Sequence, residues 1–362
     1  MVERVYHVPA PDCSDRRNAV FFVARAITML GHRFLVRPHV ELAPEIVAAR
    51  GSDHAVFLYC GLHRSLWETT GVLAPLQLAR LPLPYVAMGD NLVKGRVFQA
   101  LSKKIGTFMV QRPASRREML ESARRLRDDV LSFVAHRLDV LIFPEGTRKN
   151  IPLRSRYGEF FPASFDALLE YARNRDAIVA SNPGLKPCET YIVPLNVDYT
   201  RVREAAEMVA EEGGRPRTLH VLDSLSMIRG IGDTYLSYGT PIRVANHLDL
   251  DRKSLASLAR RRCLDLVKIL PVNVAARAMV ELGGSGAVAA GDLHRAVRAV
   301  VDRLRPFEER FRGFAAGDDP AEIVRRARRS GLDFRTVDAG RQGLYRLYAA
   351  YVEHYFAPSG DA

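Results

Sequence analysis

Long apolar runs are absent from this sequence, which limits how the chain can associate with a membrane. A helix that crosses a bilayer needs about 18 or more predominantly apolar residues, and no stretch of the 362 residues approaches that length. The best candidate, residues 19–30, is short and contains Arg25. The first residues, MVERVYHVPAPD, place acidic residues and prolines where a signal peptide needs an uninterrupted apolar stretch. We therefore expect a cytoplasmic protein, or one that lies on a membrane without crossing it.

Cysteine is scarce as well. The four cysteines, Cys13, Cys60, Cys188 and Cys263, lie far apart, with no CxxC pair and no histidine cluster at the spacing of metal ligands. This pattern is typical of free thiols in a reducing compartment and not of a disulfide framework. We expect neither a bound metal nor a redox cofactor.

Acidic residues are outnumbered. The sequence has 53 Lys and Arg against 41 Asp and Glu, a formal net charge of +12. A cationic surface favours nucleic acid, anionic lipid headgroups or phosphorylated small molecules. The sequence shows no helix-turn-helix signature, no aromatic RNA-binding motif and no zinc knuckle, so we do not expect nucleic acid as a partner. Lipid surfaces and phosphorylated compounds remain.

Short apolar segments alternate with segments of helical length. Predicted strands cover 54–59, 84–88, 105–110, 139–143 and 190–197, and predicted helices cover 65–80, a basic stretch from residue 94, 115–136 and 160–173. Strands separated by helices imply βαβ crossovers and a largely parallel sheet. Near 217–223 and 234–238 strands follow each other without a helix, which indicates an antiparallel edge.

Three regions follow from this pattern. Residues 1–50 form an N-terminal helical segment with an amphipathic helix at 14–31, and residues 51–247 form the α/β catalytic domain. Residues 248–362 form a helical C-terminal region packed on that domain, with helices predicted at 252–270, 272–282, 290–304, 321–330 and 340–356. The expected fold class is α/β, with a mostly parallel central sheet flanked by helices and a helical C-terminal region.

The first candidate site segment is GLHRSLWE, residues 61–68. Five positions correspond to about 140° on an ideal helix, so His63 and Glu68 would not face each other within one helix. If His63 lies in the turn before the helix, the Glu68 carboxylate can reach back to the imidazole. It would then hold one tautomer and stabilise the imidazolium that forms during base catalysis. Taken alone, this spacing is a common coincidence.

Three further segments follow predicted strands or coincide with them. The turn FPEGTRK at 143–149 offers backbone N–H groups near Gly146 and two cations, which suit an oxyanion or a phosphate, although a charged surface turn has the same composition. The strand at 105–110 leads to Arg112, in a stretch from 94 to 127 with ten Lys or Arg and two acids. That stretch suits a solvated helix face, a phosphate funnel or a membrane-contact stripe. The fourth segment, 191–197, contains Pro194, which indicates an edge strand or a bulge.

Five segments occur in a fixed order along the chain: HRSxxE (63–68), MGDNL (88–92), GTFMVQR (106–112), FPEGTRK (143–149) and YIVPLNVDY (191–199). This ordered set resembles the motif blocks of the glycerophospholipid acyltransferases, and it is most similar to the glycerol-3-phosphate acyltransferase branch. Residues 232–242 and 270–273 support that branch. The resemblance covers roughly residues 54–300.

The resemblance implies an acyltransferase fold and an enzyme of phospholipid synthesis. It would move a fatty acyl group from acyl-CoA or acyl carrier protein to the hydroxyl of glycerol 3-phosphate, with no metal and no cofactor beyond the acyl carrier as co-substrate. The expected partners are that carrier, glycerol 3-phosphate and an anionic membrane surface. The enzyme would be cytoplasmic and associated peripherally with the inner face of the membrane. By resemblance the catalytic residues are His63 and Glu68, and the substrate-binding residues are Arg112, Glu145, Gly146, Thr147 and Arg148.

Two departures from the family pattern keep alternatives open. The first block normally ends in aspartate, where this chain has Glu68, and the branch usually has paired arginines where this chain has Gln111 before Arg112. Either one phosphate contact is missing, or a neighbour such as Lys103 or Lys104 supplies it. The alternatives are a catalytically degenerate protein that binds lipid or acyl carrier, and an enzyme for another acceptor such as dihydroxyacetone phosphate or lysophosphatidic acid.

Overall fold

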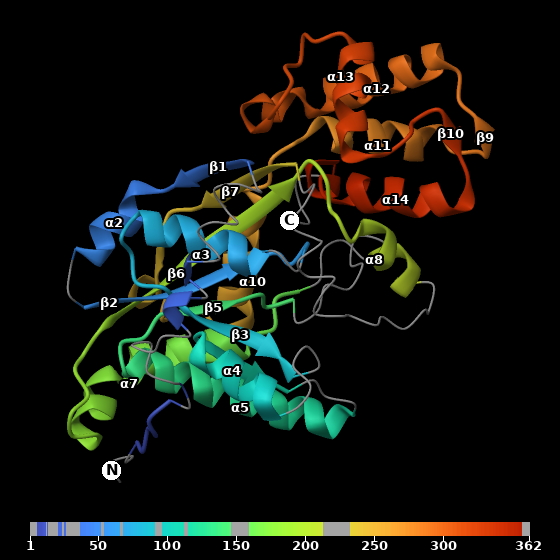
Figure 1. Cartoon of the computed structure of the whole chain (residues 1–362). Coiled ribbons are helices and arrows are strands. Elements are labelled where there is room, and N and C mark those ends of the chain that lie inside the picture. The colour runs from blue at the N-terminus through green and yellow to red at the C-terminus, as the bar shows by residue number, and fades with distance from the viewer. Residues whose placement is uncertain are drawn as a thin grey trace.

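The computed structural model describes residues 6–11, 13, 21–23, 25–26, 37–51, 54–65, 68–90, 96–111, 115–145, 159–212 and 232–356. Within these residues one large sheet has the strand order β1-β7-β6-β2-β5-β3-β4, with β8 beside β6 (Figure 1). Its strands are β1 (Arg37–Leu42), β2 (Ala55–Gly61), β3 (Tyr85–Gly89), β4 (Thr107–Val110), β5 (Val140–Ile142), β6 (Glu189–Tyr199), β7 (Asp233–Tyr238) and β8 (Ile242–Arg243).

The strands from β6 to β4 are all parallel to their neighbours in this order. β7 and β8 run antiparallel to β6, whereas β1 is parallel to β7. The mostly parallel sheet is therefore confirmed. The antiparallel strand expected at 234–238 is β7, although β1 and not β7 forms the edge of the sheet.

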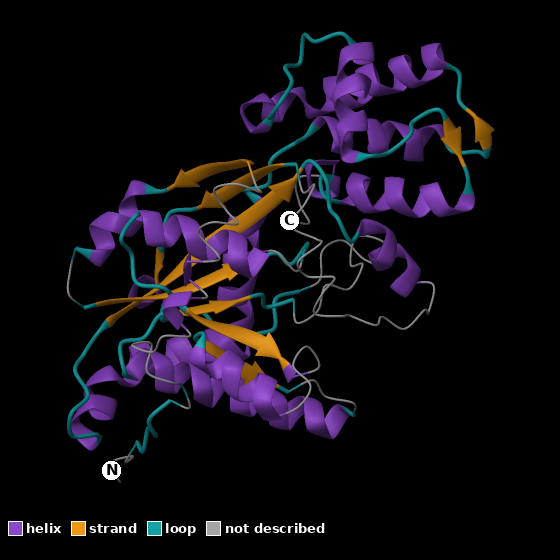
Figure 2. Cartoon of the chain, viewed as in Figure 1, coloured by secondary structure: helices purple, strands orange, loops and turns teal. Residues whose placement is uncertain are grey.

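Helices cover both faces of the sheet (Figure 2), and the alternation of β2 shows how. Val56, Leu58 and Cys60 belong to a hydrophobic cluster with side chains of α5 (Arg116–Ala135), α7 (Ala163–Ser181) and α10 (Arg252–Leu264). Phe57 and Tyr59 belong to a second cluster with α2 (Pro44–Arg50) and α3 (Glu68–Leu78). Successive residues of a strand point to opposite faces, so a fully buried strand joins two cores.

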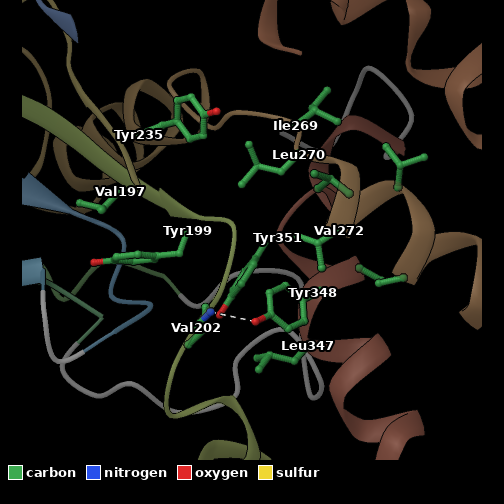
Figure 3. Close-up of a cluster of buried hydrophobic side chains, with 14 of the residues drawn as sticks. Val197, Tyr199, Val202, Tyr235, Ile269, Leu270, Val272, Leu347, Tyr348 and Tyr351 are labelled. Atoms are coloured by element: carbon green, nitrogen blue, oxygen red, sulfur yellow. Dashed lines mark hydrogen bonds between the residues drawn. The ribbon is translucent and has the colours of Figure 1, made fainter. Parts of the chain in front are cut away.

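The C-terminal region is helical, as predicted, and joins the second cluster. Its elements are α11 (Pro271–Leu282), α12 (Ala290–Leu304), η3 (Arg305–Arg310), α13 (Pro320–Ala327), η4 (Arg328–Ser330), α14 (Ala339–Ala350) and η5 (Glu353–Phe356), with the short strands β9 (Gly286–Ala287) and β10 (Thr336–Val337). Leu270, Val272 and Tyr348 pack in the same cluster as Val197 and Val202 of the sheet side (Figure 3). The helical region and the sheet therefore share one continuous core.

The elements that lie between these are α4 (Arg96–Lys104), α8 (Ala205–Glu212) and η2 (Val244–His247). None of the helices in the described part of the chain is long and apolar enough to cross a bilayer. The predicted strand at 217–223 lies outside the described residues, and of the predicted helix at 14–31 the structure describes residues 21–23 and 25–26, which are helical.

The N-terminal 50 residues contain a strand that the sequence analysis did not predict. Residues 37–42, RPHVEL, form β1 at the edge of the sheet, and α2 follows. The strand contains Pro38 and the polar residues His39 and Glu41, so it lacks the apolar run of the buried strands. An edge strand needs ladder hydrogen bonds on one side only, and proline is tolerated there.

Pro194 was predicted to mark an edge or a bulge. The edge is wrong, because β6 lies inside the sheet, but the ladder beside Pro194 is irregular in the way a bulge is. β2 pairs with one side of β6, and β7 and β8 share the other side. The Pro194 carbonyl accepts from Gly239 N–H at 2.8 Å, so the missing N–H of Pro194 points to the same side. On that side, residues 193–194 of β6 lie opposite the three residues 239–241 that connect β7 to β8, so the ladder is interrupted there and needs no donor from Pro194.

The helix predicted at 252–270 ends earlier, at Leu264. Leu270 precedes Pro271 and adopts an extended backbone, with φ −107° and ψ 156°. A residue before proline is sterically disfavoured in the helical region. Leu270 therefore cannot continue a helix. Residues 265–270 are not helical, and they connect α10 to α11.

Two phenylalanines near the start of α7 test the position of the core. Phe165 is 0% exposed and Phe161 is 42% exposed. We expect Phe165→Ala to lower the free energy of unfolding by about 3–5 kcal/mol, because it leaves a cavity in the packed core. Phe161→Ala, the matched control, should change it by less than about 0.5 kcal/mol. Urea denaturation followed by circular dichroism measures both, and equal losses would contradict the burial described here.

Candidate active site

The candidate site lies at the carboxyl ends of adjacent parallel strands, where open α/β sheets place their sites. β2 pairs with β5 on one side and β6 on the other. The segment after β2 carries His63, and the segment after β5 carries Glu145. The strand order thus brings together two segments that lie 82 positions apart in the chain.

His63 and Glu68 form a direct pair. Glu68 is the first residue of α3, and His63 lies in the turn before it. The distance from His63 Nδ1 to Glu68 Oε2 is 2.6 Å. The imidazole is 17% exposed, whereas the carboxylate is fully buried. The carboxylate reaches back from the helix to the turn, as the spacing of the two residues suggested.

The turn itself holds Glu68 in place. Glu68 Oε1 accepts hydrogen bonds from the backbone N–H of Arg64 and from that of Ser65, the latter at 2.8 Å. Free N–H groups before a helix need acceptors, and a carboxylate at the helix start supplies them. Together with His63, both oxygens of the carboxylate are used, which fixes its position.

Phe143 and Glu145, which follow β5, hold His63 from the other side. The rings of Phe143 and His63 stack with centroids 4.7 Å apart and 20° between their planes. Glu145 Oε2 accepts from the backbone N–H of His63 at 2.9 Å. The second oxygen, Glu145 Oε1, is buried and has no hydrogen-bond partner among the described residues. It is therefore a polar atom next to the His63 backbone that a ligand can satisfy.

Burial changes the acidity of both carboxyl groups. It raises the pKa of Glu145 to about 7, with a smaller increase from the Glu68 charge, while the His63 N–H and Arg64 act in the opposite direction. Burial also raises the pKa of Glu68 well above its ordinary value, against the backbone bonds and the charge of Arg64 that favour the ionised form.

Behind the pair lies a buried polar layer that the sequence analysis missed. The Arg64 guanidinium forms an ion pair with Asp198 of β6 and lies over the Tyr351 ring, 4.6 Å from its centroid. Ser65 Oγ donates to Glu204 Oε1 at 2.8 Å. Arg64 and Asp198 belong to the motif blocks at 63–68 and 191–199, so the sequence did mark them as candidates. No feature of the sequence pointed to Tyr351.

The structure brings together His63, Glu68 and Glu145 of the predicted site. The other predicted residues, Arg112, Gly146, Thr147 and Arg148, lie outside the described residues. Gln111 Oε1 accepts from Arg125 Nη1 at 2.6 Å. In the part of the chain that the structure describes, no group of His, Cys, Asp and Glu side chains has an arrangement that could hold a metal ion.

Residues 49–198 match the model of the Acyltransferase family. The matched segment extends to the penultimate residue of β6 and includes His63, Glu68, Glu145 and Asp198. No curated protein matches the chain. The family match supports a general role in acyl transfer and an enzyme of the transferase class; it does not specify the acceptor or the acyl donor.

The raised pKa of Glu145 gives a pH-dependent stability. The ordinary pKa of this group is 4.5 and the folded chain raises it to about 7, so the folded state binds the proton more tightly than the unfolded state. This contribution to stability is complete below pH 4.5 and is lost as the pH rises through 7. The quantity to follow is the free energy of unfolding of wild type minus that of Glu145→Gln. We expect this difference to fall by about 3 kcal/mol between pH 4.5 and pH 7.

Urea denaturation at several pH values measures this difference. The infrared difference spectrum of wild type minus Glu145→Gln supplies a second measurement, because the carboxyl band of Glu145 should be present in it below pH 7 and disappear near pH 7. Glu68, whose pKa is also raised, contributes to both proteins and cancels in the difference. A difference in unfolding free energy that stays flat from pH 4.5 to 7 would contradict the assignment.

Proposed function

We propose that the protein is a glycerol-3-phosphate acyltransferase, which moves a fatty acyl group from acyl-CoA or acyl carrier protein to the hydroxyl of glycerol 3-phosphate. The observation that supports acyl transfer is the His63–Glu68 pair beside Glu145, in a segment that matches the Acyltransferase family. The order of the motif blocks supports the choice of acceptor, together with the basic character of the chain.

The His63–Glu68 pair suits general base catalysis. With a proton on Nδ1 shared with Glu68, the imidazole has its lone pair on Nε2. Nε2 takes the proton of the acceptor hydroxyl as that oxygen attacks the thioester carbonyl carbon. The tetrahedral intermediate then collapses, the carbon–sulfur bond breaks, and the imidazolium returns the proton to the thiolate sulfur. Glu68 stabilises the imidazolium between the two steps.

The acceptor would be held by groups around this pair. Glu145 Oε1 faces no described hydrogen-bond partner and would bind a hydroxyl of the glycerol moiety. Arg112 and Arg148 are proposed to clamp the phosphate, since guanidinium groups bind phosphate in a bidentate manner. Arg125 donates to Gln111 Oε1 at 2.6 Å, so its guanidinium lies beside the residue that occupies the position of the missing arginine. Arg125 is therefore a further candidate, with Lys103 and Lys104, for the second phosphate contact.

Peripheral binding to an anionic membrane would fit the product, because a lysophosphatidic acid must enter a bilayer. The first half of α5 supports this part of the proposal. Met119 and Leu120 are 39% and 60% exposed, and Arg117, Arg124 and Arg125 are exposed in the same part of the helix. Two exposed acids, Glu118 and Glu121, lie among them, and Glu121 pairs with Arg117. Apolar side chains among cations are typical of helices that lie on anionic lipid surfaces.

The substitution of glutamate for the family's aspartate does not separate the catalytic pair. The extra methylene of Glu68 is accommodated, since its carboxylate still contacts His63 at 2.6 Å and both backbone donors of the turn. This geometry favours the active enzyme over a degenerate protein that only binds lipid or acyl carrier.

Acyl transfer from palmitoyl-CoA or palmitoyl carrier protein to radiolabelled glycerol 3-phosphate, with anionic vesicles present, tests the proposal. We expect product with wild type and a loss of about a hundredfold or more with His63→Ala, because the general base is removed. His136→Ala is the matched control, since His136 is also partly buried but lies at the end of α5 and bonds to Ser132. It should retain wild-type activity.

The other outcomes separate the alternatives. Product with dihydroxyacetone phosphate or lysophosphatidic acid, and none with glycerol 3-phosphate, would reassign the acceptor. Product that His63→Ala leaves unchanged would reject His63 as the base. Binding of acyl carrier or lipid with no product from any of the three acceptors would support the degenerate protein.

The role of Glu68 is tested by its charge and its length. Glu68→Gln keeps the size but loses the charge that stabilises the imidazolium, so we expect kcat to fall by about 10²–10⁴ and KM to change little. Glu68→Asp restores the family residue and keeps the charge, so it should retain more activity than Glu68→Gln. If steady-state kinetics show equal activity for wild type and Glu68→Gln, Glu68 does not assist His63.

A further inference from the structure

We propose that Arg64 is a positioning residue for the His63–Glu68 pair, and that Asp198 and Tyr351 hold it in place, so that the C-terminal helical region completes the catalytic unit. This inference rests on the proposed role of His63 and Glu68 in acyl transfer. Arg64 is poorly placed to bind substrate directly, because its side chain is only 4% exposed. It forms an ion pair with the Asp198 carboxylate, which is 2% exposed.

Arg64 is connected to the catalytic pair through its backbone. It lies between His63 and Ser65, and its N–H donates to Glu68 Oε1. Ser65 N–H donates to the same oxygen. Any displacement of the Arg64 backbone would therefore move the donors that fix Glu68 and the residue that carries the base.

Asp198 anchors the guanidinium in the sheet. Its Oδ1 accepts from Arg64 Nη1, and its Oδ2 accepts from Asn196 Nδ2 and from the backbone N–H of Lys268, the latter at 2.8 Å. Both oxygens are thus occupied by donors from three segments of the chain. A buried carboxylate with its hydrogen bonds satisfied is a rigid partner, because any movement would leave a charge unpaired.

Tyr351 anchors the guanidinium from the C-terminal region. Its ring is 5% exposed and lies 4.6 Å from Arg64 Cζ, a distance at which a cation and an aromatic ring attract each other. The last turn of α14, which directly precedes Tyr351, is itself fixed. Tyr348 Oη accepts from Val202 N–H at 2.8 Å (Figure 3), and Asn273 Nδ2 donates to the Tyr348 carbonyl at 2.9 Å. Tyr351 lies far beyond residue 198, where the family match ends.

Arg64 also acts on the pair through its charge. The ionisable groups around the pair come from several elements: Arg64, Glu145, Asp198, Tyr199, Glu204, Arg260, Tyr351 and His354. Among these, the positive charge of Arg64 favours the ionised form of Glu68. Removing it should make the pair easier to protonate, whereas removing the negative charge of Asp198 should make the pair harder to protonate.

The test compares Arg64→Gln with Asp198→Asn in the full-length protein. The acid limb of the pH–kcat profile should move to higher pH in Arg64→Gln and to lower pH in Asp198→Asn, each by about one pH unit. In both variants kcat should fall about tenfold or more, and KM for acceptor and donor should stay within about twofold. The double variant carries neither charge, so its acid limb should return toward that of wild type. A purely structural role predicts no opposite shifts.

Removing one member of a buried ion pair can destabilise a protein strongly, so circular dichroism and thermal unfolding accompany each variant. Tyr351→Phe and Tyr351→Leu form a matched pair that changes no charge. Phenylalanine keeps the aromatic face under Arg64 and should keep kcat within about twofold, whereas leucine removes it and should lower kcat about fivefold or more. Arg64→Lys keeps the charge, and it should leave the acid limb near that of wild type.

Shifts of the acid limb in the same direction for Arg64→Gln and Asp198→Asn, or a rise in the KM for the acceptor with unchanged kcat, would overturn the proposal. Titration of the His63 ring by NMR in the substrate-free protein measures the same opposite shifts without any turnover. If no acceptor gives product but these NMR shifts occur, the proposed function fails while the positioning role stands. If acyl transfer proceeds and the shifts are missing, the positioning role fails alone.

Discussion

The carboxylate of Glu68 is fully buried and accepts hydrogen bonds from the His63 ring and from the backbone N–H groups of Arg64 and Ser65. A buried carboxylate is costly unless such donors surround it. The same donors belong to the turn between β2 and α3. The hydrogen bonds to Glu68 therefore fix both the shape of this turn and the orientation of the imidazole. The stacking of Phe143 then acts on a ring that is already placed, and Glu145 binds the backbone N–H of the same residue.

The strand order explains why residues so distant in the sequence meet at this carboxylate. β2 lies between β5 and β6, and all three strands are parallel. Their carboxyl ends therefore share one edge of the sheet, where His63, Glu145 and Asp198 lie. The ordered motif blocks of the sequence correspond to these strand ends.

Periodicity predicted the elements with buried faces and missed those without. The parallel strands and most helices appear close to the expected residues, because fully buried strands have uninterrupted apolar runs and amphipathic helices repeat every three to four residues. β1 has neither signal. β6 tolerates Pro194 because its pairing with β7 and β8 is interrupted at that point, and the local sequence of β6 does not show this interruption. In the site, the His63–Glu68 contact is local and its geometry was predictable. The Arg64–Asp198 pair joins residues 134 positions apart, and the approach of Tyr351 depends on how the helical region packs.

That packing argues against treating the family-matched segment as a self-contained catalytic unit. A chain ending at residue 198 would lack Tyr351 under Arg64 and the Lys268 N–H that binds Asp198. It would also expose Val197 and the neighbouring apolar residues of the sheet, which are now covered by Leu270, Val272 and Tyr348 (Figure 3). Apolar surface of this kind is stable only when another element covers it. The helical region therefore contributes both to the stability of the sheet and to the environment of the His63–Glu68 pair, and the two contributions cannot be separated by truncation.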